Sequence, residues 1–331
     1  MERGSAAQAD VLDSELVELE LESWADFVKE FALSESPNWI FRGHSGFGWS
    51  LVSSLQRAFE SAGITGVEDR VAMENSTVGF FKERARLRLE RPPDEHDLLG
   101  WLAVMQHYGA PTRLQDWTQS PFVAAYFAYR DNTAEDAAVW ALQAYFCRRN
   151  LTPVMLGQPW DHLGVLEASG HDKDGNEVTL FPWTELTPTE VDNEALREAI
   201  RGGNGWPLPI LPLAYDSRMA AQQAVFLCAT RLDFALESLL DKEAWPHAVD
   251  PQRIAEATSE QASYKLHDSY QLIKRVRLRA AWRDDALRTL RQMGISEETL
   301  FPGLDGSGRA ARMHIASREL GLRDALHSLG F

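Results

Sequence analysis

The sequence is poor in cysteine, in long apolar runs and in positive charge. Its 331 residues include two cysteines, Cys147 and Cys228, which cannot form a disulfide framework and fit a reducing cytoplasm. No segment reaches the roughly 18 uncharged apolar residues that a membrane span needs, and the start lacks the basic and apolar regions of a secretory signal. The formal net charge of −16 argues against a general DNA-binding or membrane-binding surface. Arginines do cluster at 84–91 and 274–291, so a local basic groove is compatible with the sequence. We expect a cytoplasmic protein with no membrane partner and no general DNA binding.

Several motif classes are also missing. The chain has no internal repeat, no regular βαβ alternation and no Gly-rich phosphate loop after a first strand, which argues against a doubly wound fold. The nine histidines include no pair at helical spacing and there is no cysteine cluster, so a zinc site is not expected. The interspersed helices and strands predict a mixed α+β fold with a mainly antiparallel sheet. We expect a disordered acidic arm over 1–15 and a single domain over 16–331, with a loop-rich insertion around 150–209.

Apolar periodicity and turn residues predict the main elements of this domain. Strands are expected at 16–21, 39–43, 137–147, 224–230 and 270–280. Helices are expected at 24–33, 68–89, 98–108, 120–129, 193–200 and 281–294, with two more within 232–263 and a last one after 295. The segment 46–57 is expected to be a loop with a brief apolar run, and 216–218 a polar turn. In the helix over 68–89, the apolar Phe80, Phe81 and Leu87 are expected to share one side, and Glu74 either faces solvent or pairs with a buried arginine.

The stretch 101–129 places an unusual number of polar residues in an apolar setting. Its first helix should end at Gly109, with His107 in the last turn, and its second should begin after Ser120 with Pro121 at the first helical position. Between these helix ends lies a polar connection that contains Thr112, Arg113, Asp116, Trp117 and Thr118. The C-terminus of one helix attracts cations, and the free N–H groups of the next attract an anion. Such clusters mark functional sites, although an Arg113–Asp116 ion pair, a capping histidine and core aromatics would explain the same residues structurally.

Arg42 is the second candidate feature. It stands near the end of a short predicted strand, before the conformationally permissive Gly43. Its guanidinium could hold a phosphate or a carboxylate in bidentate fashion, or it could form a buried pair with Glu74 or Asp116. Arg57 is a second candidate cation.

Four segments occur in an order that resembles the FRG-domain family, named for its Phe-Arg-Gly triplet. They are WIFRGHSGFGWSLVSSLQR, QHYGAPTRLQDWTQSPFVAAYFAY, SRMAAQQAVF and GISEETLFPGLD, with a helix carrying Glu74 between the first two. Residues 41–43 match the triplet, and the resemblance extends from about 39 to 305. The sequence departs from the family at Gln115, where a leucine is usual, and at Ala224, where a glycine is expected.

A second resemblance is to ADP-ribosyltransferases of the Arg-Ser-Glu type. It rests on residues 41–43, on Thr118-Gln119-Ser120 followed by 124–127, and on Gln222-Gln223 leading into 224–226. It implies an NAD site in which the arginine and a helix N-terminus hold the pyrophosphate, the hydroxyls order the site, and Tyr108 or Trp117 stacks on nicotinamide. Glutamine replaces the usual glutamate, and a carboxylate best stabilises the cationic sugar of the transition state. NAD binding or hydrolysis therefore stays open beside transfer.

These observations predict an NAD-binding enzyme, acting by ADP-ribosyl transfer or NAD hydrolysis as a bacterial toxin or antiphage effector. The residues expected to carry the chemistry are Arg42, His107, Asp116 and Gln222, which should line one cleft. Those expected to bind the cofactor are Arg42, Gly43, Tyr108, Arg113, Trp117, Thr118 and Ser120. Two alternatives stay open: a metal-independent nuclease with His44 and His107 as acid and base, and a non-catalytic ligand-sensing or interaction module. The expected partners are a nucleotide or small-molecule ligand and a protein or RNA target.

Overall fold

A computed structural model describes most of the chain that carries the predicted motifs. The described residues are 17–32, 39–131, 135–144, 168–171, 177–180, 207–210, 217–232, 236, 273–304, 306–308 and 310–311. The predicted acidic arm and the predicted helix at 193–200 lie outside these residues, as does nearly all of 232–263. No helix of the described part is long and apolar enough to cross a membrane.

The helices and strands alternate irregularly along the chain. The helices are α1 (Trp24–Ala32), α2 (Ser54–Ser61), α3 (Val67–Ala85), α4 (Leu98–His107), α5 (Pro121–Arg130), α8 (Ser217–Ala221), α11 (Arg283–Gln292) and α12 (Glu297–Leu300), with a 3-10 turn at Ala280–Trp282. The strands are β1 (Val17–Leu19), β2 (Trp39–His44), β3 (Leu114–Thr118), β4 (Ala137–Gln143), β5 (Ala168–His171), β6 (Glu177–Leu180), β7 (Leu208–Ile210), β8 (Ala224–Cys228) and β9 (Ile273–Leu278).

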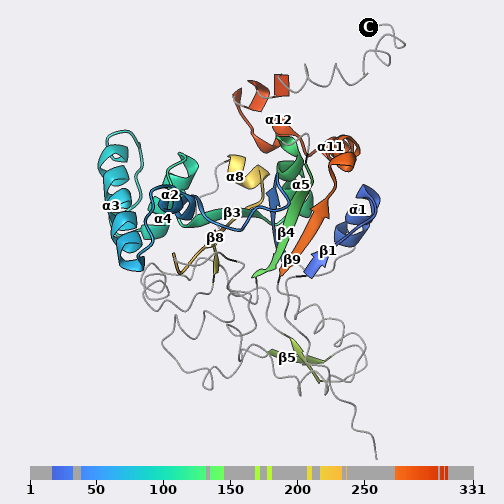
Figure 1. The fold of residues 1–331 in the computed structure, drawn as a ribbon, viewed down its shortest axis with the longest axis horizontal. Helices are drawn as coiled ribbons and strands as arrows, with labels where there is room; N and C mark the ends of the chain where they lie inside the picture. The colour runs from blue at the N-terminus through green and yellow to red at the C-terminus, as the bar shows by residue number, and fades with distance from the viewer. Residues whose placement is uncertain are drawn as a thin grey trace, which may run out of the picture.

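The core is a seven-stranded sheet in the order β1-β9-β4-β2-β3-β8-β7, and β5 and β6 form a separate two-stranded sheet. Among the described strands, the β1–β9 pair is parallel and the other neighbouring pairs are antiparallel. The predicted α+β fold with a mainly antiparallel sheet is therefore confirmed. The predicted strand near the N-terminus is confirmed as well, and this strand, β1, lies at one end of the sheet (Figure 1).

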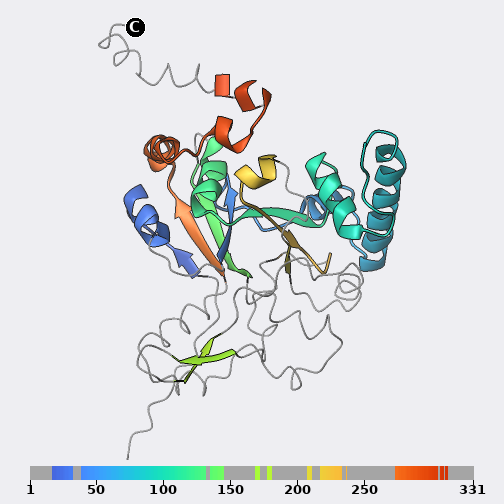
Figure 2. The same ribbon diagram turned by 180° about the vertical axis from the view of Figure 1, so that it is seen from behind.

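Strand periodicity decides which side chains face which layer. Trp39 and Phe41 of β2 point toward α1, α5 and α11, where they join the largest apolar cluster. Ile40 on the same strand points to the opposite face of the sheet, where it lies in one apolar cluster with Leu51 and Trp140. At the opposite end of the molecule, α3 and α4 cover β3 and β8 (Figure 1, Figure 2). The sheet is thus packed against two separate groups of helices.

Three expectations about local structure are wrong. The predicted loop at 46–57 contains the start of α2, because Ser53 and Gln56 form a reciprocal capping box that starts a helix. The polar connection after α4 contains β3, which is stabilised by pairing with β8 rather than by its own periodicity. The predicted turn at 216–218 is the start of the short helix α8 over 217–221.

The apolar residues of α3 also differ from the expectation. Phe81 packs against the cluster between α3 and α4, whereas Phe80 and Leu87 are exposed. The buried face of α3 instead contains Glu74, whose carboxylate is paired with a buried arginine.

Candidate functional site

The sheet opens between β2 and β3. These strands share one register pair, Phe41 with Thr118, whereas β2 pairs with β4 at six positions and β3 pairs with β8 at five positions. In Figure 1, β3 runs across the direction of β4 and β9. On the side that faces β3, the backbone groups after Phe41 therefore need hydrogen-bond partners other than that strand. Arg42 is the next residue of β2.

The Phe-Arg-Gly triplet divides its side chains between the two faces of the sheet. Phe41 is buried under the helices and makes an edge-to-face contact with Phe31. Gly43 lies beneath α5, where an added Cβ would stand 2.0 Å from the carbonyl oxygen of Ala124 and 2.7 Å from the amide nitrogen of Ala128. The expectation that this glycine supplies a permissive backbone at a strand end is wrong, because its φ is not positive. The absence of a side chain lets α5 pack directly on β2, and this contact accounts for Gly43 without a ligand.

Arg42 faces the other side and joins the two diverging strands. Its Nε donates to Nε2 of His44 at 3.1 Å, and its Nη1 donates to the carbonyl oxygen of Asp116 at 2.5 Å. The side chain thus supplies the donor that the interrupted ladder lacks. Burial lowers the pKa of Arg42, the charge of Asp116 raises it, and nearby Arg57 lowers it again, with a net decrease. Nη2 makes no hydrogen bond to any described residue, so part of a half-buried cation is available to an anion.

His44 is held in its neutral form beside this guanidinium. Because Nε2 accepts from Arg42, the proton resides on Nδ1, which lies 3.3 Å from the carbonyl oxygen of Trp49. Burial and the charge of Arg42 lower the pKa of His44 to about 3, with a smaller lowering by Arg57 and an opposing effect of the Trp49 carbonyl. The imidazole therefore orients Arg42 without adding a second positive charge.

The depressed pKa predicts an acid-sensitive contribution to stability. The unfolded chain protonates His44 near its ordinary pKa of 6.5, whereas the folded chain keeps it neutral down to about 3. Stability from this residue is therefore complete above pH 6.5 and is lost as the pH falls toward 3. One pKa unit corresponds to about 1.4 kcal/mol, so the loss near pH 4.5 should be about 2 to 3 kcal/mol. Urea unfolding at pH 7.5 and 4.5 should show a smaller decline for His44→Gln than for the wild type. The control variant His96→Gln, at an exposed histidine, should lose as much stability between the two pH values as the wild type. An equal loss for His44→Gln and the wild type would contradict the assignment.

Asp116 is positioned from the helix side of the opening. Its exposed carboxylate accepts a hydrogen bond from Nε2 of Gln106 at 2.8 Å, and Oε1 of Gln106 accepts from the hydroxyl of Thr112 at 2.6 Å. The backbone of Thr112 is fixed in turn by the hydroxyl of Ser54 and the amide of Leu55 at the start of α2. The end of α4 and the start of α2 therefore hold a negative charge close to Arg42.

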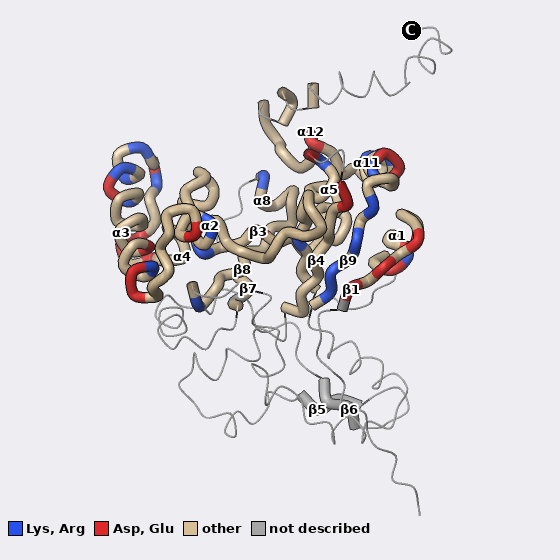
Figure 3. Tube along the Cα trace, in the orientation of Figure 1, with Lys and Arg blue, Asp and Glu red and all other residues tan. Residues whose placement is uncertain are grey.

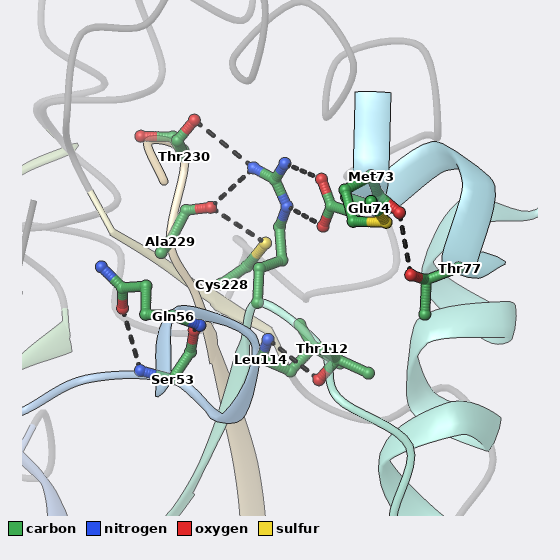
Figure 4. A network of polar contacts seen from close by, with 11 residues as sticks. Ser53, Gln56, Met73, Glu74, Thr77, Thr112, Leu114, Cys228, Ala229 and Thr230 are labelled. Carbon is green, nitrogen blue, oxygen red and sulfur yellow. Dashed lines mark hydrogen bonds and ion pairs between the residues drawn. The ribbon is translucent and has the colours of Figure 1, made fainter. Parts of the chain in front are cut away.

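Arg113 has a different role from the one predicted. Its Nε and Nη2 donate to the two carboxylate oxygens of Glu74, and its Nη1 donates to the carbonyl oxygens of Ala229 and Thr230. Figure 4 shows Glu74 on one side of the guanidinium and Ala229 on the other. Burial lowers the pKa of Arg113, but hydrogen bonds and charge from Glu74 outweigh this and raise it overall. The structural alternative of an Arg113–Asp116 pair is also wrong, since the partner is Glu74.

The remaining predicted residues do not gather around Arg42. Thr118 donates to the backbone carbonyl of Gln222 and accepts from the amide of Ser120, and Ser120 caps α5. The side chain of Gln222 donates to the carbonyl of Leu300, which ties it to α12 rather than to Arg42. Trp117 is buried in the core and donates to Gln115, so it is not accessible for stacking.

His107 and Tyr108 lie at the exposed C-terminal end of α4, with their rings in edge-to-face contact. The helix ends as predicted, because Gly109 has a positive φ and its amide, with that of Ala110, bonds back into the last turn. Of the four residues expected to share a cleft, the structure brings Arg42 and Asp116 together.

Two members of the cluster were missed from the sequence. Gln106 was not recognised as the support of Asp116, since only the fold shows that α4 ends beside β3. Trp49 lies in a glycine-containing loop and contacts His44 through its backbone carbonyl and its ring. The signal that could have found it is a large aromatic side chain in a polar loop.

The fold and the cluster define an α+β domain in which an arginine of a central strand bridges an opening in the sheet. Residues 37–137 match the family model of the FRG domain. This part of the chain, from β2 to the start of β4, is therefore an FRG domain, and the family predicted from the sequence is confirmed. No curated protein and no solved structure matches the chain.

The departure from the family at Gln115 is accommodated by polar contacts. Its Nε2 donates to the carbonyl of Leu51 at 3.0 Å, and its Oε1 accepts from the indole of Trp117. A glutamine is therefore accommodated at this buried position because both ends of its amide are bonded.

Proposed function

We propose that the cluster around Arg42 binds the phosphates of a nucleotide, with NAD as the preferred ligand. The observation that carries the proposal is the guanidinium of Arg42, which is held by two hydrogen bonds and leaves Nη2 unbonded to described residues. A fixed, partly desolvated guanidinium is a strong donor to phosphate oxygens, because it loses little side-chain entropy on binding.

Neighbouring groups support a dinucleotide rather than a simple anion. Arg57 lies close enough to Arg42 to lower its pKa, so two cations are available to a pyrophosphate. Trp49 is 59% exposed and offers an aromatic face on which a base could stack. His44 stays neutral, so it positions Arg42 and does not attract the ligand by charge.

The same cluster suggests a reaction. In NAD hydrolysis the bond between ribose C1′ and the nicotinamide nitrogen breaks, and the electron pair leaves with nicotinamide. A water oxygen then bonds to C1′ and releases a proton, giving ADP-ribose. Positive charge develops on the ribose, and the carboxylate of Asp116, oriented by Gln106, is the group of the cluster that would stabilise it. Transfer replaces water with an acceptor on a target. An enzyme of this kind would act as a toxin or antiphage effector by consuming NAD.

Calorimetry and an NAD-consumption assay test the proposal with two variants. Arg42→Ala removes a charged donor to phosphate, which is worth about 1.5 to 3 kcal/mol, so the Kd for NAD should rise by about 10-fold to 100-fold. Asp116→Asn keeps the shape and a hydrogen-bond acceptor for Gln106 but removes the charge. It should leave the Kd within about 3-fold and lower the rate of nicotinamide release by about 100-fold or more, the order seen when one transition-state donor is removed.

The matched control is Arg288→Ala, which removes an exposed arginine on α11 that pairs with Asp285. It should change neither binding nor turnover. Circular dichroism and thermal unfolding will show that the variants are folded. Absence of NAD binding by the wild type at millimolar concentration, or unchanged binding by Arg42→Ala, would refute the proposal.

The nuclease alternative is less favoured by the geometry. A general base needs a free lone pair, and the lone pair of His44 already accepts from Arg42. His107 lies at the exposed C-terminal end of α4, where its ring contacts Tyr108. RNA cleavage that survives EDTA and is lost in His107→Ala would still establish that function. A non-catalytic module would bind its ligand without turnover in both the wild type and Asp116→Asn.

A further inference from the structure

A tight turn over residues 46–49 follows β2 and carries two aromatic side chains. The amide of Trp49 donates to the carbonyl oxygen of Gly46 at 3.2 Å, which closes the turn. The amide of Phe47 donates to the carbonyl oxygen of Asp136, just before β4, at 2.8 Å. The indole of Trp49 lies against Gly46, where an added Cβ would stand 2.4 Å from its Nε1. The positions of Phe47 and Trp49 are therefore coupled through the backbone of the turn.

The ring of Phe47 is contacted by two arginines of β9. The guanidinium carbons of Arg277 and Arg275 lie 3.6 Å and 4.4 Å from the centroid of the ring. A guanidinium within about 6 Å of an aromatic centroid is attracted to the face of the ring. Figure 3 shows the basic residues along β9. Phe47 also packs against the apolar cluster that contains Trp140, so the ring is held both by the sheet and by two cations.

Strand register places these arginines on the same face of the sheet as the candidate site. Arg42 of β2 is opposite Trp140 of β4, which is opposite Arg275 of β9. His44 is related in the same way to Arg277, through one residue of β4. Residues directly opposite one another on neighbouring strands share a face of the sheet. The arginines that contact the turn therefore lie on the face that carries the candidate site.

Acidic side chains hold both arginines in place. Nη2 of Arg275 is paired with Glu18 of β1, and Nε of Arg277 donates to Glu20 at 2.7 Å. Nη1 of Arg277 also donates to the carboxylate of Asp136 at 3.3 Å. Carboxylates thus balance the charges of both arginines, which favours a role in holding the aromatic ring over a role in binding an anion.

We propose that Phe47 anchors the turn to β9, and that Arg275 and Arg277 are thereby positioning residues for the candidate site. The anchored turn places the carbonyl oxygen of Trp49 3.3 Å from Nδ1 of His44. With its proton on Nδ1, the imidazole keeps Nε2 as the acceptor for the guanidinium of the candidate site. A continuous set of contacts thus runs from β9 through the turn to this guanidinium. The expected effect on NAD rests on the proposed function, whereas the environment of His44 does not.

NMR titration of His44 in protein with isotopically labelled histidine tests the anchor without any ligand. Burial is the largest cause of the low pKa of His44, followed by the charge of Arg42, with a smaller lowering by Arg57. Phe47→Ala should release the turn and admit water, so the pKa should rise from about 3 toward the ordinary 6.5. His44 should then be partly protonated at pH 5.5, whereas it should be neutral in the wild type and in Phe47→Tyr, which keeps the ring. Phe80→Ala removes a ring with a similar arginine contact on α3, and this matched control should also keep His44 neutral.

Arg277→Gln tests the same anchor from β9 and decides the outcome if Phe47→Ala does not fold. It should raise the pKa of His44 in the same direction but by less, since the second cation stays on the ring. The control is Arg279→Gln, which breaks an ion pair with the same Glu20 without removing either cation from Phe47. This control should leave His44 neutral at pH 5.5.

Calorimetry with NAD at pH 7.5 tests the link between the anchor and the site. Phe47→Ala should raise the Kd by up to about 10-fold, because the guanidinium of Arg42 is displaced rather than removed, and Phe47→Tyr should stay within about 3-fold of the wild type. If His44 stays neutral at pH 5.5 in the folded variants, the anchor is overturned. If His44 is protonated and the affinity for NAD is unchanged, the link to the site is overturned. A wild type that does not bind NAD would refute the proposed function alone, and the titration of His44 would still decide the anchor.

Discussion

Replacing Glu74 with alanine should lower the free energy of unfolding by about 3 to 5 kcal/mol. Arg113 is 2% exposed, and the variant would leave its guanidinium buried without its counter-charge and without two hydrogen bonds. The carbonyls of Ala229 and Thr230 would remain as partners, but they carry no net charge. Because a domain is stable by only about 5 to 15 kcal/mol in total, guanidinium chloride unfolding should show a large shift of the midpoint.

Two comparisons define this prediction. Arg288→Ala breaks an exposed pair with Asp285 and should cost less than about 1 kcal/mol. Adding Arg113→Met to Glu74→Ala removes the unpaired charge, so the double variant should be less destabilised than the sum of the single ones. A loss below about 1 kcal/mol for Glu74→Ala would mean that Arg113 is hydrated in solution.

The Arg113–Glu74 pair also shows where prediction from sequence reaches its limit. The sequence placed Glu74 in a helix and left two alternatives for its carboxylate, a solvent-facing position or a pair with a buried arginine, of which the second is correct. Arg42 was the arginine named as a possible partner of Glu74, and this pairing is wrong, because the partner depends on which segment α3 packs against. Helix spacing defines the face on which a carboxylate lies, whereas its partner is defined by tertiary contacts between residues 39 positions apart.

Elements with strong periodicity or clear end signals were predictable. The strand at β4 is fully buried and apolar, and α5 carries both its Ser120 cap and Pro121 at the first position. By contrast, β3 is five residues long with an exposed Asp116 in its middle, and its sequence is that of a polar connection. It becomes a strand because β8 supplies backbone partners along its whole length. Pairing that is distant in sequence leaves no local pattern.

The two central residues of the candidate site were predictable from the sequence, whereas the residues around them were not. Arg42 and Asp116 were expected to converge, and they do, through a backbone carbonyl. Arg113, Trp117 and Thr118 were expected to bind a cofactor because they are adjacent in sequence to Asp116. In a strand, successive side chains alternate between faces and neighbours take different environments. Proximity in sequence therefore overestimated the number of residues available to a ligand.

Gly43→Ala should destabilise the domain by about 3 kcal/mol, at the upper end of the usual cost of overpacking. The new methyl group would meet backbone atoms of α5, the Ala124 carbonyl oxygen at 2.0 Å and the Ala128 amide nitrogen at 2.7 Å. No side-chain adjustment relieves a backbone clash, so adding Ala124→Gly should not restore stability.

Gly79→Ala is the matched control, since an added Cβ there meets nothing within 4 Å. Replacing this exposed helical glycine with alanine should raise the stability by up to about 1 kcal/mol. Chemical unfolding of the three variants gives the comparison, and a Gly43→Ala protein as stable as the wild type would mean that α5 does not lie directly on β2. Because Arg42 precedes this glycine, a shift of α5 away from β2 should also displace the guanidinium and weaken the proposed NAD binding in the folded fraction of Gly43→Ala.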